Sequence, residues 1–271
     1  MKKRIITAAV LLPLLLVVVL VLPKVFTGIL FGLMAAVAAY ELLRGTGFVK
    51  HIRLIAYAML MAFLTGLFSS LHINAGWTLL GILVFFCLLA GELLLSHTKL
   101  PFSAIAVTFL AGLVIPYLLC ATVRLHSWGN GRYYILLPFV IAFLSDTAAY
   151  FTGMFFGEHK LAPTISPKKT VEGVVGGVFG AIVGVFLYAL ILNLAFEFKA
   201  YYWYALIYGL VGSLGAVFGD LCFSAIKRQT GIKDYGNLIP GHGGILDRFD
   251  SMIVVAPLTE ALMMLIPLVV K

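Results

Sequence analysis

Charged side chains are scarce in this chain. Only 11% of its 271 residues are Asp, Glu, Lys or Arg, whereas 62% are hydrophobic, and the mean hydropathy is +1.10. A soluble globular domain carries about 25% charged residues, so the composition excludes a protein kept in solution by a charged surface. The chain needs lipid as its solvent.

Cysteine is also rare. The three residues, Cys87, Cys120 and Cys222, are widely spaced and lie inside apolar stretches. An odd number without close spacing favours neither a disulfide framework nor a cysteine metal site, so we interpret them as small buried hydrophobic residues.

The N-terminus resembles a secretory signal peptide because Lys2, Lys3 and Arg4 precede an apolar run. That run, residues 5–22, is long enough to span a bilayer, lacks a small-residue cleavage site and is followed by further spans. We therefore predict a retained first helix.

The long apolar runs predict an all-α fold, a polytopic transmembrane helix bundle of about nine spans. Lipid offers no partner to open backbone groups, and the alternation typical of a β-barrel is absent from the sequence. The predicted spans are residues 5–22, 25–43, 54–72, 76–95, 101–123, 133–156, 171–195, 201–225 and 251–270.

Basic residues predict the orientation of these spans. With the N-terminus in the cytoplasm, most of the 19 Lys and Arg residues lie on the inner side, as the positive-inside rule requires. We therefore expect a multi-pass protein of the cytoplasmic (inner) membrane with its C-terminus outside. The net charge of +8 then reflects topology and anionic partners. Nucleic acid is not among them, because no soluble basic domain exists.

The chain divides by character. Residues 1–132 form nearly pure hydrocarbon spans and are predicted to be a scaffold. Residues 133–271 are predicted to be the catalytic region, because two long polar connectors, 157–170 and 226–250, interrupt the spans there on the predicted cytoplasmic side.

Acidic residues concentrate around those connectors. An Asp at mid-bilayer costs about 2.5–3.5 kcal/mol, so it usually faces a protein interior and has a function. The alternative is an Asp at the water interface, which costs little. Six of the 11 acids lie in or beside the two connectors: Asp146, Glu172, Asp220, Asp234, Asp247 and Asp250.

The eighth predicted span ends in a polar helical face. If its helix continues, Asp220, Ser224 and Lys227 or Arg228 lie along one side. Such a stripe of hard oxygens and cations suits a metal with a polyphosphate.

Asp247 and Asp250 form a second carboxylate pair, with Arg248 between them. Carboxylates from two segments without a His or Cys cluster favour Mg²⁺ over zinc, and we predict Asp220, Asp247 and Asp250 as its ligands. The alternative for Asp247, Arg248 and Asp250 is helix capping with a local ion pair.

The connectors offer two candidate anion sites. Gly241, Gly243 and Gly244 surround His242 and would let backbone N–H groups form a nest, although a flexible loop has the same composition. The sequence contains neither a Walker motif nor a Gly-x-Gly-x-x-Gly motif, so phosphate would be held by some other arrangement.

In the other connector, Ser166 and Pro167 predict a helix start with Lys168 and Lys169 in its first turn. Cations are unfavourable there unless an anion binds. The alternative is that these lysines only maintain topology.

The run from Ser224 to Asp250 closely resembles the pattern of the bacterial phosphatidate cytidylyltransferases (CDP-diacylglycerol synthases). Upstream, Ser145-Asp146 and the block from Ser166 to Gly173 are similar to the same family's second conserved region. The resemblance implies transfer of CMP from CTP to phosphatidic acid, with release of pyrophosphate and a requirement for Mg²⁺.

The resemblance also implies roles for the site residues. Carboxylates would hold the metal, and Lys and Arg would neutralise the triphosphate and the lipid phosphate; Asp146 and Glu172 would support a second cation or orient the lysines. The implied catalytic residues are Asp220, Lys227, Arg228, Lys233, Asp234, His242, Asp247 and Arg248, and the implied substrate-binding residues are Asp146, Ser166, Lys168, Lys169, Thr170, Glu172, Ser224, Gly241, Gly243 and Gly244.

Three alternatives stay open from the sequence. They are cytidylyl transfer to another lipid phosphate, a CTP-dependent lipid kinase, and an ion-coupled transporter whose intramembrane acids carry ions. A glycine face on the seventh span, residues 173–184, suits close helix contact, within the chain or in a homodimer; we expect a dimer.

Overall fold

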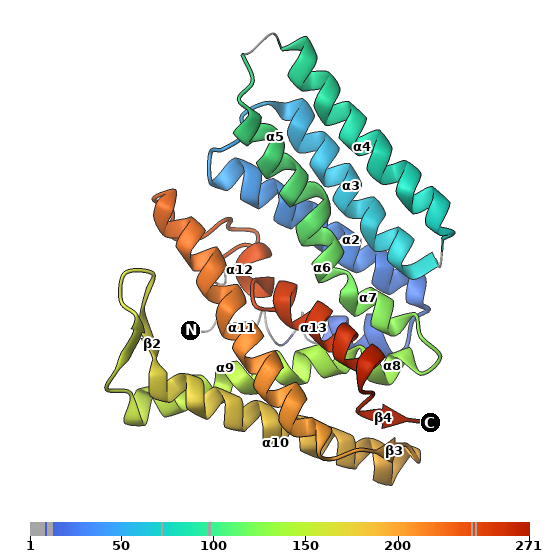
Figure 1. Cartoon of the computed structure of the whole chain (residues 1–271), viewed down its shortest axis with the longest axis vertical. Helices are drawn as coiled ribbons and strands as arrows, with labels where there is room; N and C mark the ends of the chain where they lie inside the picture. Colours follow the sequence, from blue (N-terminus) through green and yellow to red (C-terminus); the bar gives the residue numbers. More distant parts are fainter. Residues whose placement is uncertain (1–8, 10–12, 72, 97–98, 240, 242) are drawn as a thin grey trace. The chain divides into compact units, whose positions relative to one another are not determined.

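The computed structural model describes residues 9, 13–71, 73–96, 99–239, 241 and 243–271 (Figure 1). The chain forms two compact units. Unit 1 comprises Met1–Ser127 and Gln229–Phe249, and unit 2 comprises Trp128–Arg228 and Asp250–Lys271. The second polar connector thus belongs mostly to the N-terminal unit, although its ends continue into elements of unit 2.

The predicted all-α polytopic fold is confirmed. Within the described residues, seven helical segments are long and apolar enough to cross a membrane, and they correspond to seven of the nine predicted spans. They are Lys24–Gly45, Ile52–Leu71, Ala75–Leu95, Phe102–His126, Gly131–Phe156, Val171–Phe196 and Tyr204–Gln229.

The first and last predicted spans differ from these seven. In the first, residues 13–20 are helical, and residues 5–8 and 10–12 lie outside the described part. In the last, α13 (Met252–Leu265) has only 14 residues, about 21 Å of helix against a hydrocarbon core of about 30 Å. The chain leaves the helix at Ile266 and pairs β4 (Val269–Val270) with β3 (Lys199–Ala200). The span number and orientation stay predictions.

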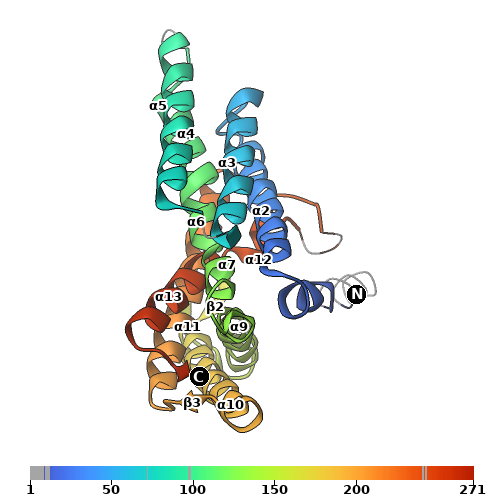
Figure 2. The same ribbon diagram turned by 90° about the vertical axis from the view of Figure 1, so that its right-hand side faces the viewer.

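Unit 1 is built on close contact between helices α2 (Lys24–Tyr40) and α3 (Ile52–Leu71), which run side by side in Figures 1 and 2. A Cβ on Gly66 would lie 2.5 Å from the Cα of Gly32 and 2.6 Å from the carbonyl oxygen of Gly28. Glycine is therefore required where the two backbones meet. The elements of unit 1 are α2 (Lys24–Tyr40), the π-helical turn η1 (Glu41–Gly45), α3 (Ile52–Leu71), α4 (Ala75–Leu95), α5 (Phe102–Phe109), η2 (Leu110–Val114), α6 (Ile115–Leu119), α7 (Ala121–His126) and α12 (Leu246–Phe249).

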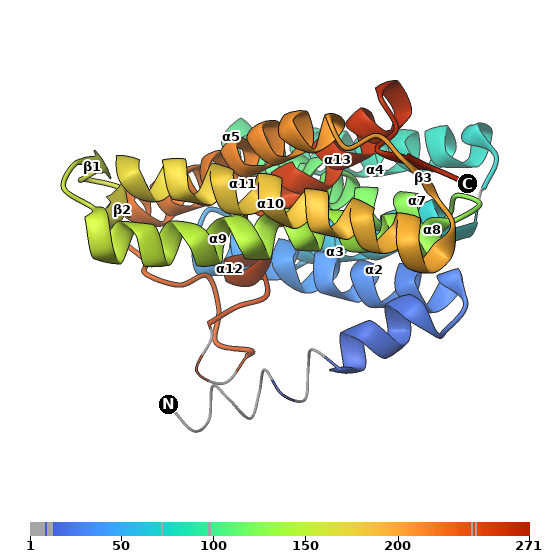
Figure 3. The ribbon, with the colours of Figure 1, turned by 90° about the horizontal axis from the view of Figure 1, so that it is seen from below.

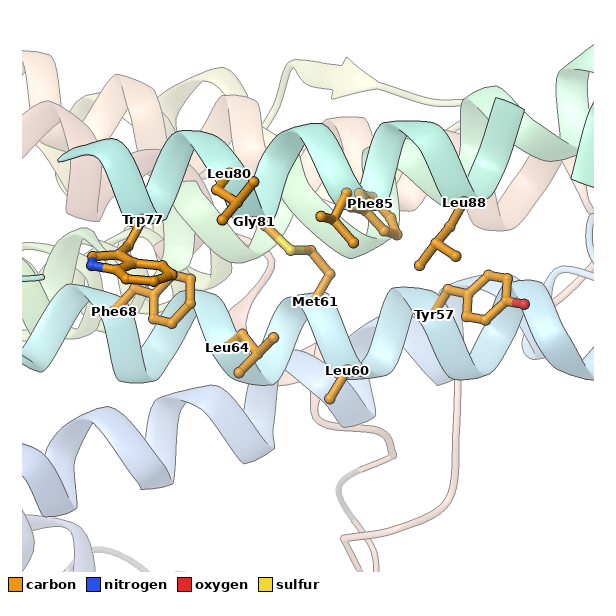
Figure 4. Close-up of a pocket in the computed structure, with 11 residues that line it drawn as sticks. Tyr57, Leu60, Met61, Leu64, Phe68, Trp77, Leu80, Gly81, Phe85 and Leu88 are labelled. Atoms are coloured by element: carbon orange, nitrogen blue, oxygen red, sulfur yellow. The ribbon is translucent and has the colours of Figure 1, made fainter. Parts of the chain in front are cut away.

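An apolar hollow of about 270 Å³ lies between α3 and α4. In Figure 4, Trp77 and Phe68 line one end of it and Tyr57 and Leu88 the other. Helix α4 is the least buried of the seven spanning segments. Side chains of this kind suit contact with acyl chains and offer few polar groups to a nucleotide.

Unit 2 is built on the antiparallel pair α9 and α10, joined at one end by a β-hairpin (Figure 3). A Cβ on Gly176 would lie 2.0 Å from Thr152 Oγ1, and one on Gly180 would lie 2.3 Å from the Cβ of Ala148. The predicted glycine face is thus used inside the chain and gives no support to a homodimer. The elements of unit 2 are α8 (Gly131–Tyr134), α9 (Leu136–Phe156), β1 (Lys160–Ala162), β2 (Ser166–Thr170), α10 (Val171–Phe196), β3, α11 (Tyr204–Gln229), α13 and β4.

The predicted helix start at Ser166 and Pro167 is wrong. Residues Ser166–Thr170 form strand β2, which pairs with β1 through Ala162↔Ser166 and Lys160↔Thr170. Helix α10 begins at Val171, with Thr170 as its N-cap. Thr170 is also a favoured capping residue, although Ser ranks above Thr. Pairing of Ser166–Thr170 with β1, which a local pattern cannot show, decides between the two positions.

We predict that Gly66→Ala destabilises unit 1 by about 1–3 kcal/mol, because the added methyl group meets immovable backbone on α2. Gly91→Ala on α4 is the matched control, since no atom lies within 4 Å of its added Cβ. Thermal unfolding in detergent should show a lower Tm for the first variant only. Equal melting temperatures would contradict the close α2–α3 contact.

Candidate active site

The β1–β2 hairpin carries the two lysines predicted to bind an anion. Thr170 closes its base, because Thr170 Oγ1 accepts a hydrogen bond from the Gly173 N–H at 3.1 Å. Cβ atoms added to Gly153 or Gly157 of the preceding helix and turn would lie 2.9 Å from the same Oγ1. The hydroxyl group of Thr170, a residue predicted to bind substrate, thus caps the N-terminus of α10. Ser166 lies at the other end of the strand, paired with Ala162.

Glu172 holds the same hairpin from α10. Its carboxylate accepts the backbone N–H groups of Glu158 and His159 at 3.2 Å and contacts the His159 ring at 2.5 Å. Of the two predicted roles for Glu172, these contacts match the orienting one. Arg228 of helix Tyr204–Gln229 also holds the hairpin, because its Nε donates a hydrogen bond to the Ile165 carbonyl at 3.1 Å.

The hairpin brings Lys169 to the polar face of α11. The Lys169 ammonium forms an ion pair with Asp220, and Asp146 of α9 lies within electrostatic reach of both. Helix α11 continues to Gln229, so Asp220, Ser224 and Lys227 share one face as the spacing required. Lys168, the neighbour of Lys169, is exposed.

Asp250 completes this cluster, which we call the carboxylate cluster: Asp146, Asp220 and Asp250 with Lys169 and Lys227. Asp250 is only 6% exposed and accepts the Ser251 N–H at 2.7 Å. Burial, followed by the nearby Asp220 carboxylate, raises the pKa of Asp250 to about 7, although Lys227 acts in the opposite direction. Crowded carboxyl groups of this kind are relieved by a bound cation.

The donor set of the carboxylate cluster fits Mg²⁺. Within the part of the chain that the structure describes, no three His, Cys, Asp or Glu side chains form a ready-made metal site. Mg²⁺ does not need one, since it is commonly held by one or two carboxylates together with substrate phosphates. Asp220 and Asp250, which lie within hydrogen-bonding reach of each other, supply that pair.

Asp247, the third predicted metal ligand, has a different environment. It belongs to unit 1, is 9% exposed, and its Oδ2 accepts the N–H groups of Tyr235 and Gly244 at 2.9 and 3.0 Å. These bonds resemble the local, capping-like alternative to metal binding. Because Asp220 and Asp247 lie in different units, their convergence on one ion stays a prediction.

The glycine-rich connector forms a tight loop in unit 1. Ile239 N–H donates to the Gly243 carbonyl at 2.9 Å, and Gly241 and Gly243 have φ values of +78° and +85°, which favour glycine. The other predicted site residues in this connector differ in exposure. Lys233, Asp234 and Arg248 are exposed, Gly244 is buried, and His242 lies outside the described residues.

Sequence reasoning missed Glu41. This acid starts η1, is only 4% exposed, and accepts the N–H groups of Ile245 and Leu246 at 3.0 and 2.8 Å. The available signal was a lone carboxylate at the end of an apolar span, the type of residue that usually has a function.

We predict that Glu172→Ala loosens the hairpin, because three contacts to its carboxylate are lost. Amide hydrogen exchange across Lys160–Thr170 should become severalfold faster. Glu158→Ala is the control, because it removes a neighbouring exposed acid and keeps the Glu158 N–H. Unchanged exchange in Glu172→Ala would refute the orienting role.

The chain is similar to known proteins over different lengths. A model of the cytidylyltransferase family matches residues 2–266. Proteins named phosphatidate cytidylyltransferase from Staphylococcus saprophyticus, Staphylococcus aureus (strain COL) and Staphylococcus haemolyticus are 44%, 45% and 41% identical over 134 residues. That segment is 49% of this chain and 50% of each relative, so the chain spans about half the length of the curated relatives it matches. Because the family model covers nearly all of its residues, the chain belongs to the cytidylyltransferase family.

Proposed function

We propose that this protein is a phosphatidate cytidylyltransferase of phospholipid biosynthesis. A phosphate oxygen of phosphatidic acid attacks the α-phosphorus of CTP and forms a new P–O bond. The bond between the α-phosphorus and the bridging oxygen to the β-phosphate breaks, so that CDP-diacylglycerol and pyrophosphate are the products. The names of the curated relatives support phosphatidate as the acceptor.

The observation that carries the proposal is the carboxylate cluster. Lys169 and Lys227 stand beside Asp220 and Asp250 at the polar end of an apolar span. Phosphoryl-group chemistry depends on positioning and charge neutralisation, which ammonium groups and a carboxylate-held cation provide without a covalent protein intermediate. A substrate whose tails stay in lipid explains why the cluster lies in a membrane protein.

The surroundings of each residue indicate its role in the proposed reaction. Asp220 and Asp250 would hold Mg²⁺, which when bound neutralises phosphate charge. Lys169 and Lys227 are buried or half-buried beside these carboxylates and orient a phosphate group there. Lys233 and Arg248, in the glycine-rich connector of unit 1, stay predicted ligands of the triphosphate of CTP.

The proposed location is the cytoplasmic (inner) membrane, with the active site facing the cytoplasm. The seven apolar segments make the chain a multi-pass membrane protein. The concentration of Lys and Arg in the predicted inner segments supports the orientation.

The decisive assay uses CTP labelled at either end of its triphosphate. Purified protein with phosphatidic acid and Mg²⁺ in detergent should transfer the label from α-³²P-CTP to lipid, and leave that of γ-³²P-CTP in pyrophosphate. Lipid labelled from the γ-position would indicate a kinase. If neither α-³²P-CTP nor γ-³²P-CTP labels the lipid in the presence of phosphatidic acid and Mg²⁺, the proposed activity is refuted.

Asp220→Asn should lower kcat on the order of 100-fold or more, because it removes charge from the proposed cation site and from the Lys169 ion pair. Glu197→Gln is the control, since this exposed acid follows the last residue of α10 and should keep full activity. Retention of wild-type turnover by Asp220→Asn, with normal size-exclusion behaviour, would remove Asp220 from the active site.

A further inference from the structure

Glu41 lies at the end of the span Lys24–Gly45, yet its partners are far along the chain. Its carboxylate oxygens accept the N–H groups of Ile245 and Leu246, residues 204 and 205 positions away. Leu246 is the first residue of α12, the helical turn that contains Asp247 and Arg248, and Ile245 directly precedes it. A buried carboxylate with two backbone donors is a strong, directional contact.

Two glycines of the loop, Gly236 and Gly244, leave room for the same side chain. A Cβ on Gly236 would lie 2.4 Å from Glu41 Oε1, and one on Gly244 would lie 2.5 Å from Oε2. Neither glycine has a positive φ, so backbone conformation does not explain them. The close approach of Glu41 does.

The end of the same π-helical turn makes a second close approach. A Cβ on Gly45 would lie 2.5 Å from the Tyr235 carbonyl oxygen. The Tyr235 N–H in turn donates to Asp247. Residues 235–239 and 243–247, which we call the loop limbs, are therefore held from η1 at one side and by Asp247 at the other.

We propose that Glu41 is a positioning residue that sets the loop limbs for the nucleotide. It holds α12 and Gly236 in one arrangement, and so fixes where Asp247, Arg248 and the adjoining Lys233 and Asp234 are presented. The inference rests on the proposed function, because it gives these residues a role toward the triphosphate of CTP.

The geometry requires a carboxylate of this length. Glutamine at position 41 keeps one acceptor oxygen and turns an NH₂ group toward the other N–H donor, so one bond is lost and a donor faces a donor. Aspartate is one methylene shorter and withdraws from the N–H groups of Ile245 and Leu246.

Two measurements on purified Glu41→Gln test the proposal. Amide exchange at Gly244, Ile245 and Leu246 should rise at least tenfold, with no change across α3 and α4. The KM for CTP should rise at least tenfold, while that for phosphatidic acid stays within twofold. A general loss of folded enzyme would lower kcat and leave both KM values unchanged, and that result would overturn the positioning role.

Glu92→Gln is the matched control. Glu92 is also an acid within a span of unit 1, contacts Arg53 at 3.7 Å, and accepts the Tyr57 hydroxyl at 3.2 Å. Its substitution should leave exchange in the loop limbs and both KM values as in wild type.

Gly236→Ala changes the same contact from the loop side. It tests the proposal even if the Glu41→Gln variant does not fold. Its methyl group displaces the Glu41 carboxylate, so it should reproduce the rise in exchange and in the KM for CTP. The double variant should be no worse than either single one; additive effects would overturn the proposal. If wild-type protein makes no CDP-lipid, the proposed function fails, and exchange alone decides whether Glu41 holds the loop limbs.

Discussion

A carboxylate at the end of an apolar helix must be matched by a cation or by N–H groups, and this requirement governs the polar parts of both units. Ionic groups removed from water lose hydration that only close partners replace. In unit 2 Asp220 pairs with Lys169, and in unit 1 Glu41 accepts two backbone N–H groups. The polar connectors are ordered by these contacts.

The two connectors use this device in similar ways. Glu172 gathers the N–H groups of Glu158 and His159 and closes the hairpin that presents Lys169. Glu41 accepts the N–H groups of Ile245 and Leu246 at the start of α12 and so holds the glycine-rich loop. In each unit an acid borne by a helical segment thus positions a polar connector. Rigid helices thereby hold in place the groups that the proposed phosphate chemistry would use.

Glycine has two separate uses in this chain. On α10, Gly176 and Gly180 let the helix approach α9 closely, which is how helices associate without a hydrophobic driving force. In the loop, Gly236 makes room for the Glu41 carboxylate. The sequence indicated close helix contact for the first group, within the chain or in a homodimer, and gave no role to Gly236, because a glycine shows only that space is needed and not what fills it.

The sequence by itself determined the all-α membrane fold, seven of the spans, and the continuation of α11 that places Asp220, Ser224 and Lys227 on one face. Hydropathy and helical periodicity are local properties, so they can be read from neighbouring residues. Only the tertiary structure decided that Ser166–Thr170 is a strand, that α13 is short, that Asp250 lies beside Asp220, and that Glu41 belongs with the loop. Each of these depends on a partner distant in the sequence, and a buried polar group is satisfied by whichever partner the fold brings to it.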